Sequence, residues 1–390
     1  MSVEIVGFGL DDKKNIKKFA EFPWNHYKDD PYYVPNLKGE LLGNKILSIK
    51  GILTADHPYH EGAVVYHWLA YKDNKIAGRI AAAVNRDYNE YKKTKIANFS
   101  FFESIDDKEV ATALFKEAGK WAKEKGMKTL RGPGAYSNAT HEPYQTCLVE
   151  GFDDSPCLEM TYNYKYYPDL YEGFGFKKAK DYVAITMPTD HPESHREERL
   201  MKMLRKKHKF ETRPINPKKM KEEVTNHIVR IYNEAWAENW GFMPIKEAEA
   251  DAMADVLLLI ASPDLIRFAM IDGKEVAVVG FLPDLHEAFA LRKSIFGNSD
   301  IVRLIRMFLT KTKIERYRFM FIGVLPEHKN TGADALLSFE IRTHIFKSLP
   351  KAKRLEASLL LEDNHSVINL AKRRGGGEVY KRYRVYDYKL

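Results

Sequence analysis

The sequence of 390 residues is poor in cysteine, with only Cys147 and Cys157. Two thiols cannot form a disulfide framework, and their spacing fits neither a CxxC motif nor a zinc ribbon. The N-terminal residues lack the apolar core of a signal peptide, and no stretch approaches the roughly 18 apolar residues of a membrane span. We therefore expect reduced thiols and a cytoplasmic protein, with peripheral contact with a membrane left open.

Several chemical signatures are also missing. The 13 histidines show no HExxH or HxxEH spacing and no GxSxG sequence occurs, so we expect neither a bound metal nor a serine nucleophile. No nucleic-acid-binding module is recognisable, and basic and acidic residues alternate along most of the chain. The net charge is only +8, from 62 Lys and Arg against 54 Asp and Glu. This mild excess favours a small anionic partner, an acidic carrier protein or a membrane surface, and we expect no nucleic acid.

The residues that are present predict a globular protein. Apolar residues make up 44% of the chain and charged residues 30%, which is ordinary for a folded protein, and the length suits two domains. Short runs rich in Val, Ile and Tyr predict strands at 64–71, 76–84, 98–103 and 129–132. An apolar stripe at helical spacing predicts a helix over 110–125. This alternation indicates an α+β (α/β) fold.

The second half of the chain repeats the order of elements in the first. The matches share one offset of 199 residues and pair Ala70, Asp73 and Lys75 with Ala269, Asp272 and Lys274. We therefore predict two copies of one unit, each a mixed, mostly antiparallel sheet flanked by helices. The N-terminal domain is placed at 1–187 and the C-terminal domain at 216–390. A basic linker over 188–215, carrying one helix near 194–208, joins them.

The segment 322–337 carries the clearest signal for ligand binding. A strand ends in Val324-Leu325-Pro326-Glu327, a short polar loop follows, and a helix begins directly after Gly332. The free N–H groups and the dipole at a helix N-terminus favour an anion, and glycine permits an unusual backbone conformation there. The sequence therefore predicts a phosphate-binding loop.

This loop resembles the pyrophosphate loop of the GNAT superfamily of acyl-CoA-dependent N-acyltransferases, whose pattern is Val-x-Pro-Glu-x-(Arg/Gln)-x-x-Gly-x-(Gly/Ala). His328 or Lys329 stands near the Arg/Gln position, and Gly332 stands at the first Gly. The resemblance implies acetyl-CoA or a longer acyl-CoA as co-substrate, without a metal. It also implies the CoA-binding residues, which are Val324, Leu325, His328, Lys329, Asn330, Thr331, Gly332, Ala333 and, at the end of the next strand, Asn364.

A second motif lies in the other half. Residues 170–176, LYEGFGF, resemble the family pattern Leu-Tyr-Glu-x-x-Gly-Phe, so a tandem pair of GNAT units covers nearly the whole chain. The N-terminal half has Asp106 and Asp107 in place of the glycine-rich loop, and we expect these residues to cap a helix rather than bind CoA. The C-terminal half has Leu370 where the family often keeps a tyrosine general acid. Tyr171 holds that position in the N-terminal half.

Acyl transfer of this kind needs a base for the attacking amine and a donor for the oxyanion. The candidate bases are Glu142 and Glu103, the candidate acid is Tyr171, and we expect the oxyanion donor at a strand bulge near Gly323–Leu325. The candidate acceptor-binding residues are Asn138, beside the first base, and Trp240 and Phe242, in an apolar loop. Simpler interpretations as strand-end, loop or core residues stay open for them.

Wider patterns, such as LRGPGAYSNATHE and NEAWAENWGFMP, resemble bacterial tandem-GNAT proteins related to bacterial ceramide synthases. The resemblance implies an N-acyltransferase that moves an acyl group from acyl-CoA, or from an acyl carrier protein, to a primary amine, including a long-chain or sphingoid amine. The implied partners are thus a small-molecule or lipid-like amine and an acyl carrier protein. Two alternatives stay open: a non-catalytic acyl-CoA-binding or scaffold protein, and an aminoacyl-tRNA-dependent transferase of the peptidoglycan-bridge type.

Overall fold

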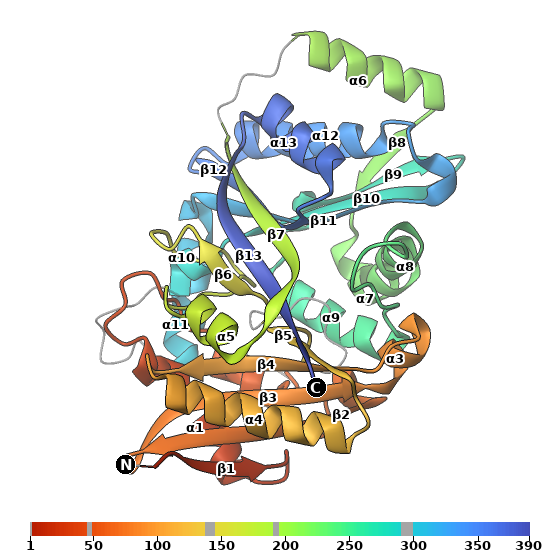
Figure 1. The fold of residues 1–390 in the computed structure, drawn as a ribbon. Helices are drawn as coiled ribbons and strands as arrows, with labels where there is room; N and C mark the ends of the chain where they lie inside the picture. The colour runs from red at the N-terminus through yellow and green to blue at the C-terminus, as the bar shows by residue number, and fades with distance from the viewer. Residues whose placement is uncertain (1, 45–48, 137–144, 190–194, 290–298) are drawn as a thin grey trace.

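A computed structural model describes residues 2–44, 49–136, 145–189, 195–289 and 299–390. These residues form a mixed, mostly antiparallel sheet of 13 strands flanked by helices (Figure 1). The order across the sheet is β1-β2-β3-β4-β5-β13-β7-β12-β11-β10-β9-β8, and β6 pairs with β13. The predicted α+β class is confirmed.

The elements follow one another as strands and helices along both halves. The strands are β1 (Glu4–Phe8), β2 (Ala63–Lys72), β3 (Lys75–Asn85), β4 (Ile96–Ser104), β5 (Thr129–Gly132), β6 (Cys147–Glu150), β7 (Lys177–Pro188), β8 (Glu211–Pro214), β9 (Ile266–Ile271), β10 (Lys274–Pro283), β11 (Arg316–Val324), β12 (Arg354–Leu361) and β13 (Glu378–Lys389). The helices are α1 (Lys13–His26), α2 (Lys38–Leu42), α3 (Arg86–Lys92), α4 (Lys108–Glu124), α5 (Tyr167–Phe174), α6 (His195–His208), α7 (Met220–Glu223), α8 (Arg230–Ala235), α9 (Glu247–Ile260), α10 (His286–Phe289), α11 (Asp300–Thr310), α12 (Ala333–Ser348) and α13 (His365–Gly375).

The two halves share a hairpin that matches in its register. At the turn, Lys72 pairs with Lys75 in the first half and Ile271 pairs with Lys274 in the second. The register shifts at Ala77 in the first hairpin and at the equivalent Val276 in the second. The turn residues Asp73, Asn74, Asp272 and Gly273 all have positive φ, between 50° and 75°. Such turns match the twist of the flanking strands. The predicted repeat with an offset of 199 residues is therefore confirmed in the structure.

The last strand of each half lies beside the other half's strands. β13, at the end of the chain, pairs with β5, from Tyr386 opposite Gly132 to Lys389 opposite Thr129. β7, from the first half, pairs with β12. β7 and β13 also pair with each other, and Figure 1 shows them running together through the middle of the molecule. The two halves thus share one sheet, and the division into 1–187, 188–215 and 216–390 stays a prediction about folding units.

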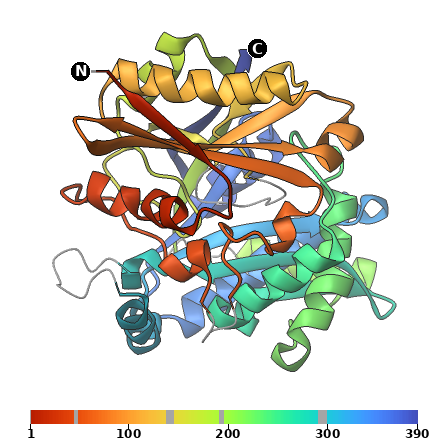
Figure 2. The same ribbon diagram turned by 90° about the horizontal axis from the view of Figure 1, so that it is seen from below.

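Helices of the repeat cover equivalent faces of the sheet. The apolar stripe of α4 is buried, with Val110, Leu114, Ala118 and Ala122 facing the strands as its spacing predicts. α12 buries Leu336, Leu337, Ile341 and Ile345 against the strands of the second half. Figure 2 shows α4 above the strands of the first half and α1 below them. No helix of the described residues combines the length and the apolar character that crossing a bilayer requires.

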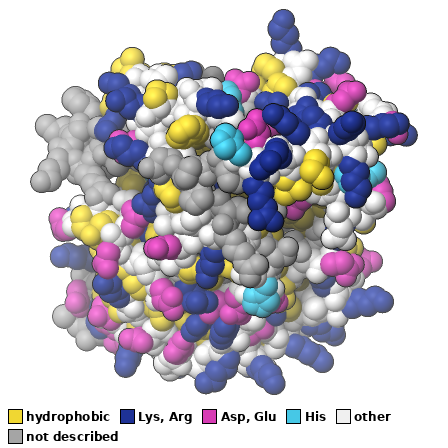
Figure 3. Space-filling model, turned by 90° about the horizontal axis from the view of Figure 1, so that it is seen from above, with side chains coloured by type: hydrophobic (Ala, Val, Ile, Leu, Met, Phe, Trp, Pro, Cys, Tyr) yellow, Lys and Arg dark blue, Asp and Glu magenta, His cyan; other side chains and the backbone are white. Residues whose placement is uncertain are grey.

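The basic segment between the halves contains the predicted helix, α6, which packs on α12. Arg342 of α12 forms an ion pair with Glu197 of α6 at 2.9 Å, and Leu204 lies against Gly332 at the start of α12. Most of the basic side chains of α6 are exposed. Figure 3 shows Lys and Arg side chains gathered on the face that carries α6 and α12. The helix therefore turns an apolar side to the second half and a charged side to solvent.

Each half contains two parallel strands that separate. β11 and β12 pair only from Arg316–Arg354 to Phe319–Ala357, and β4 and β5 only from Ile96–Thr129 to Asn98–Arg131. β11 then continues to Val324 beyond its pairing with β12. Strands that diverge this way leave backbone N–H and C=O groups along an open edge.

The bulge of β11 lies upstream of the expected position. Gly280 pairs with Phe321 and Phe281 with Phe319, so Met320 is the extra residue. The expectation of a bulge near Gly323–Leu325 is wrong, because that stretch keeps a regular register with β10. A Cβ on Gly280 would come within 2.5 Å of the Phe321 ring, so the bulge forms where β10 has no side chain to hold that ring away.

Candidate active site

A cavity of about 400 Å³ lies where β11 and β12 separate. Its walls come from both halves: β11, β12 and residues 235–243 from the second, and residues 133–135, 145–146 and parts of β5 and β7 from the first. This volume is within the roughly 300–1,000 Å³ typical of small-molecule sites. The shared sheet therefore brings the open edge of β11 against the first half.

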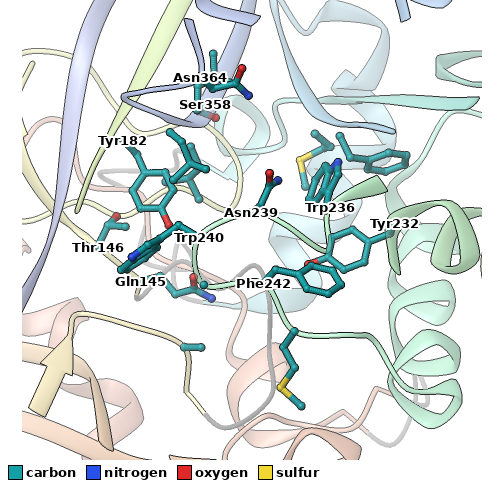
Figure 4. Close-up of a pocket in the computed structure, with 18 of the residues that line it drawn as sticks. Gln145, Thr146, Tyr182, Tyr232, Trp236, Asn239, Trp240, Phe242, Ser358 and Asn364 are labelled. Atoms are coloured by element: carbon teal, nitrogen blue, oxygen red, sulfur yellow. The ribbon is translucent and has the colours of Figure 1, made fainter. Parts of the chain in front are cut away.

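Trp240 points into this cavity from the second half (Figure 4). The Arg131 guanidinium lies over its ring at 4.9 Å, and the Tyr182 ring is 6.1 Å away. Arg131 is fixed by two hydrogen bonds to the Asp387 carboxylate, at 2.7 and 2.8 Å. Arg131 lies on β5 of the first half and Asp387 on β13 of the second. The pairing of these two strands therefore positions the Arg131 guanidinium that contacts Trp240.

Phe242 lines the same cavity and is also a packing residue. Its side chain is 4% exposed, and its ring lies 5.5 Å from that of Tyr232 and 6.1 Å from that of Tyr91. Figure 4 shows Phe242 beside Tyr232 and Trp236. The aromatic loop thus combines both interpretations of the sequence, because it packs against the protein and forms an apolar cavity wall.

The open edge of β11 is positioned by helix α8 and the residue after it. The indole N–H of Trp236 donates to the carbonyl oxygen of Ile322 at 2.9 Å. A Cβ on Gly323 would lie 2.9 Å from the Ile231 side chain, so this glycine lets α8 approach the strand closely. The end of β11, through Val324, then lines the cavity.

The predicted donor loop begins where β11 ends. It runs through a 3-10 turn at Pro326–His328 into α12, and the Thr331 hydroxyl donates to the His328 carbonyl at 2.7 Å. Asn330 has φ 66° and Gly332 φ 82°, and α12 starts at Gly332 without a side-chain cap. An uncapped helix start with left-handed residues before it directs N–H groups outward, which suits a phosphate.

The other predicted donor residues divide between the cavity and the core. Val324, Lys329 and Asn364 line the cavity. Leu325 and Ala333 are buried beside it in the core of the second half. Asn364 also caps α13, since its side chain accepts the Val367 N–H at 3.4 Å.

The first half has the equivalent loop in a closed form. The backbone of the two loops begins in the same way. The Ile105 N–H donates to the Ala77 carbonyl in the first half, and the Leu325 N–H donates to the Val276 carbonyl in the second, both at 2.9 Å. Only residues 105–107 then precede α4, and the Asp107 carboxylate accepts N–H groups at 2.8 and 3.3 Å. The predicted helix cap is confirmed for Asp107. A carboxylate already occupies the place that an anion would take.

Glu103 lies in a second, small cavity of about 30 Å³. Its carboxylate accepts the Tyr167 hydroxyl at 2.7 Å and the Tyr27 hydroxyl, and Arg79 lies 3.7 Å away. Burial raises the pKa of Glu103, and Arg79 and the two hydroxyls lower it without reversing the shift. Pro133 and Thr146 line both cavities, so these residues separate Glu103 from the main cavity.

Tyr171, the predicted acid, also lines the small cavity and not the main one. It is 1% exposed, and its ring packs 5.1 Å from the rings of Phe102 and Tyr386. Burial raises the pKa of its phenol. The structure therefore places Tyr171 with Glu103 in the first half rather than against the separated strands of the second.

Glu142 and Asn138 lie outside the described residues. Of the two described residues that flank this segment, Gln145 lines the main cavity, and Tyr136 is buried in the core of the first half. Among the described residues, no Asp, Glu or His lines it. Within the described chain, no three or more His, Cys, Asp and Glu residues come together as metal ligands would.

The structure adds cavity residues that the sequence did not indicate. They are supplied mostly by the first half and by the separated strands: Tyr88, Asn98, Arg131, Thr146, Tyr182, Arg318 and Ser358. Burial raises the pKa of the Tyr182 phenol, so it is protonated at neutral pH. Tyr182 lies in β7, and only knowledge that β7 pairs with β12 would have pointed to it.

Comparison with known proteins gives relatives that span the chain. A scan against models of protein families finds no match. Protein YghO of Escherichia coli (strain K12) is 32% identical over 97% of this chain and 94% of its own length. Bacterial ceramide synthase of Caulobacter vibrioides (strain NA1000 / CB15N) is 27% identical over 96% of this chain and 95% of its own.

The fold also has a solved counterpart. A tandem GNAT protein from the clavulanic acid biosynthesis pathway superposes with a TM-score of 0.55 at 13% identity, covering 100% of this chain and 98% of that one. The likeness confirms the predicted tandem GNAT fold.

Proposed function

Because the chain belongs to the family of Protein YghO and has the tandem fold of the GNAT N-acyltransferases, we propose that it acylates a primary amine that carries a long apolar chain. The donor is acyl-CoA or an acyl carrier protein. The observation that carries the proposal is the cavity between the halves, which runs from the donor loop residue Lys329 to the aromatic loop at Trp240.

The donor side of this cavity fits a pantetheine thioester. The uncapped start of α12 and the left-handed Asn330 and Gly332 suit the pyrophosphate of CoA. The open edge of β11 offers backbone groups to an extended amide chain. When bound, the co-substrate supplies the activated acyl group, and the protein's part is to hold its thioester beside the amine.

The acceptor side is apolar with a few polar groups. Tyr232, Trp236, Trp240 and Phe242 form an aromatic wall, which suits an alkyl chain better than a charged small amine. The relative named bacterial ceramide synthase supports an amine of the sphingoid class. The protonated Tyr182 hydroxyl is suited to donate a hydrogen bond at the reacting end.

The attacking amine must lose a proton, and two carboxylates are proposed for this. Glu142 is proposed to act directly, and Gln145, three residues after it, lines the cavity. Glu103 is proposed to act indirectly, with Thr146 and water in the small cavity carrying the proton between the amine and the carboxylate. The buried hydroxyl oxygen of Thr146 has no hydrogen-bond partner in the described chain. A carboxylate whose pKa is raised by burial is better matched to an amine than an ordinary one.

The two bases make different predictions for the pH dependence. Glu142→Gln should lower kcat about 100-fold or more if this carboxylate takes the proton directly. Glu103→Gln should lower kcat less and remove the acidic limb of the profile, because its raised pKa sets where the base becomes ionised as pH rises. The check is kcat against pH for both variants, with unfolding midpoints as control. A Glu103→Gln profile identical to that of the wild type would exclude the relay.

The function itself is tested by acyl transfer in the purified full chain. We expect saturable binding of acetyl-CoA or long-chain acyl-CoA by calorimetry, and turnover with long-chain primary amines. Trp240→Ala should raise KM for a long-chain amine about tenfold while changing KM for a short amine little, since one indole wall is lost. Trp121→Ala, which alters a tryptophan on α4, is the matched control.

The alternatives give different outcomes. Binding of acyl-CoA without turnover on any amine would indicate the non-catalytic binding protein. Binding of aminoacyl-tRNA without binding of either CoA compound would contradict the proposal and favour the peptidoglycan-bridge type of transferase.

A further inference from the structure

Helix α11 presents an apolar face to solvent. Its side chains Ile301, Ile305, Phe308 and Leu309 are 63%, 54%, 55% and 72% exposed. Their spacing places them on one side of the helix. Figure 1 shows α11 beside α10 at the edge of the molecule. Large apolar side chains gathered on one exposed face mark an interaction surface.

The opposite side of α11 is anchored to the first half. Arg303 is 2% exposed and donates to the carbonyls of Pro35 and Asn36 at 2.9 and 3.2 Å. Asp300 accepts the N–H groups of Lys38 and Gly39 at 2.9 and 2.7 Å. The exposed face is therefore held in place by polar contacts from behind, and its apolar side chains are not needed for that docking.

The charges around this face are positive. Arg306 lies on the helix, and Lys311 and Lys313 follow it directly. None of the three forms an ion pair with a described residue, although Lys311 lies 6.0 Å from the centre of the Phe308 ring. The helix has one carboxylate, Asp300, and its oxygens are taken by α2. The surface thus combines an apolar face with cations that lack carboxylate partners.

We propose that α11 binds the surface of an anionic lipid bilayer. The four apolar side chains enter the boundary of the acyl chains, and Arg306, Lys311 and Lys313 reach the lipid headgroups. A second copy of the chain would offer this face no free carboxylate from α11, whereas anionic headgroups supply negative charge beside an apolar interior. This inference goes beyond the acyl transfer proposed above and does not depend on it.

The test is co-sedimentation of the full chain with vesicles of phosphatidylcholine alone and with added phosphatidylglycerol. The wild type should bind the anionic vesicles, and Phe308→Glu should weaken that binding about tenfold or more. Phe346→Glu on α12 is the matched control, because Phe346 is 56% exposed against 55% for Phe308, and it should bind like the wild type. Lys311→Glu with Lys313→Glu should abolish the preference for anionic vesicles.

Three results would overturn the proposal. The first is a wild type that binds neither vesicle, and the second is an equal loss in Phe308→Glu and Phe346→Glu. The third is a wild-type dimer that Phe308→Glu converts to monomer without any vesicle binding, which would assign the face to a second copy. If Phe308→Glu fails to fold, the paired lysine variant and the dependence of binding on salt decide the outcome.

Discussion

Replacing Gly332 with valine should raise the Kd for acyl-CoA about 10- to 100-fold, which corresponds to about 1.4–3 kcal/mol of lost binding. Gly332 has φ 82°, a conformation that a β-branched residue adopts only at a cost of about 1–2 kcal/mol. Its Cβ would also lie 2.8 Å from the Leu204 side chain of α6. The end of the Leu204 side chain can turn aside, but the strain at this φ is relieved only by a shift of the backbone, and the N–H groups proposed to hold the pyrophosphate shift with it.

Gly273→Val is the matched control for this experiment. Gly273 has φ 75°, so valine meets the same backbone strain, but no atom lies within 4 Å of its added Cβ. It sits in the turn between β9 and β10, away from the cavity lining. We expect both variants to lose stability and only Gly332→Val to lose affinity in a calorimetric titration with acyl-CoA. Unchanged affinity in Gly332→Val would remove this loop from the donor site.

Local signals in the sequence predicted much of the fold. The hairpins, β4, α4 and α12 follow from short-range patterns of apolar residues and turn residues. The repeat was predicted mainly from the shared order of elements, and the few identities between the two hairpins, among them Asp73 and Asp272, gave it an offset. The turn between β11 and α12 could be predicted because it depends on residues adjacent in the chain, from Val324 to Gly332, and its role as the donor loop stays a proposal.

The cavity could not be predicted in the same way, because it is assembled by long-range pairing. Nothing in the composition of β7 or β13 indicates which half each strand joins. Their exchange brings Tyr182 next to β12 and Asp387 next to Arg131. Similarly, the bulge of β11 depends on Gly280 in the neighbouring strand, so the position that the family resemblance implied lay too late in β11.

Replacing Arg316 with methionine should lower the free energy of unfolding by about 3–5 kcal/mol, because it leaves a buried carboxylate without its partner. Arg316 is 5% exposed and Asp284 is 0% exposed, and their atoms approach to 2.5 Å. The guanidinium also donates to the carbonyls of Ser155 and Pro156, both at 3.0 Å. Since Arg316 begins β11 and residues 155–156 belong to the first half, this network joins the two halves.

Lys353→Met tests whether any lost cation would have the same effect. Lys353 pairs with Glu315 at 2.6 Å, but its side chain is 69% exposed, so we expect a change of at most about 1 kcal/mol. The measurement is chemical denaturation monitored by fluorescence. The unfolding transitions seen by near-ultraviolet and by far-ultraviolet circular dichroism should coincide with it, and this must be checked because a chain of two halves need not unfold in one step.

The double variant Arg316→Met with Asp284→Asn separates the buried charge from the lost hydrogen bonds. Asp284 accepts the Leu158 N–H at 2.9 Å and the His286 N–H at 3.1 Å through the same oxygen, and an amide oxygen can keep both contacts. We expect the double variant to be more stable than Arg316→Met alone, since it removes the charge of Asp284 and leaves only Glu356, 3.8 Å from Arg316 in the wild type, as a buried carboxylate that has lost this partner. A double variant as unstable as the single one would mean that the carbonyl contacts to residues 155 and 156, rather than the ion pair, hold the two halves together at this point.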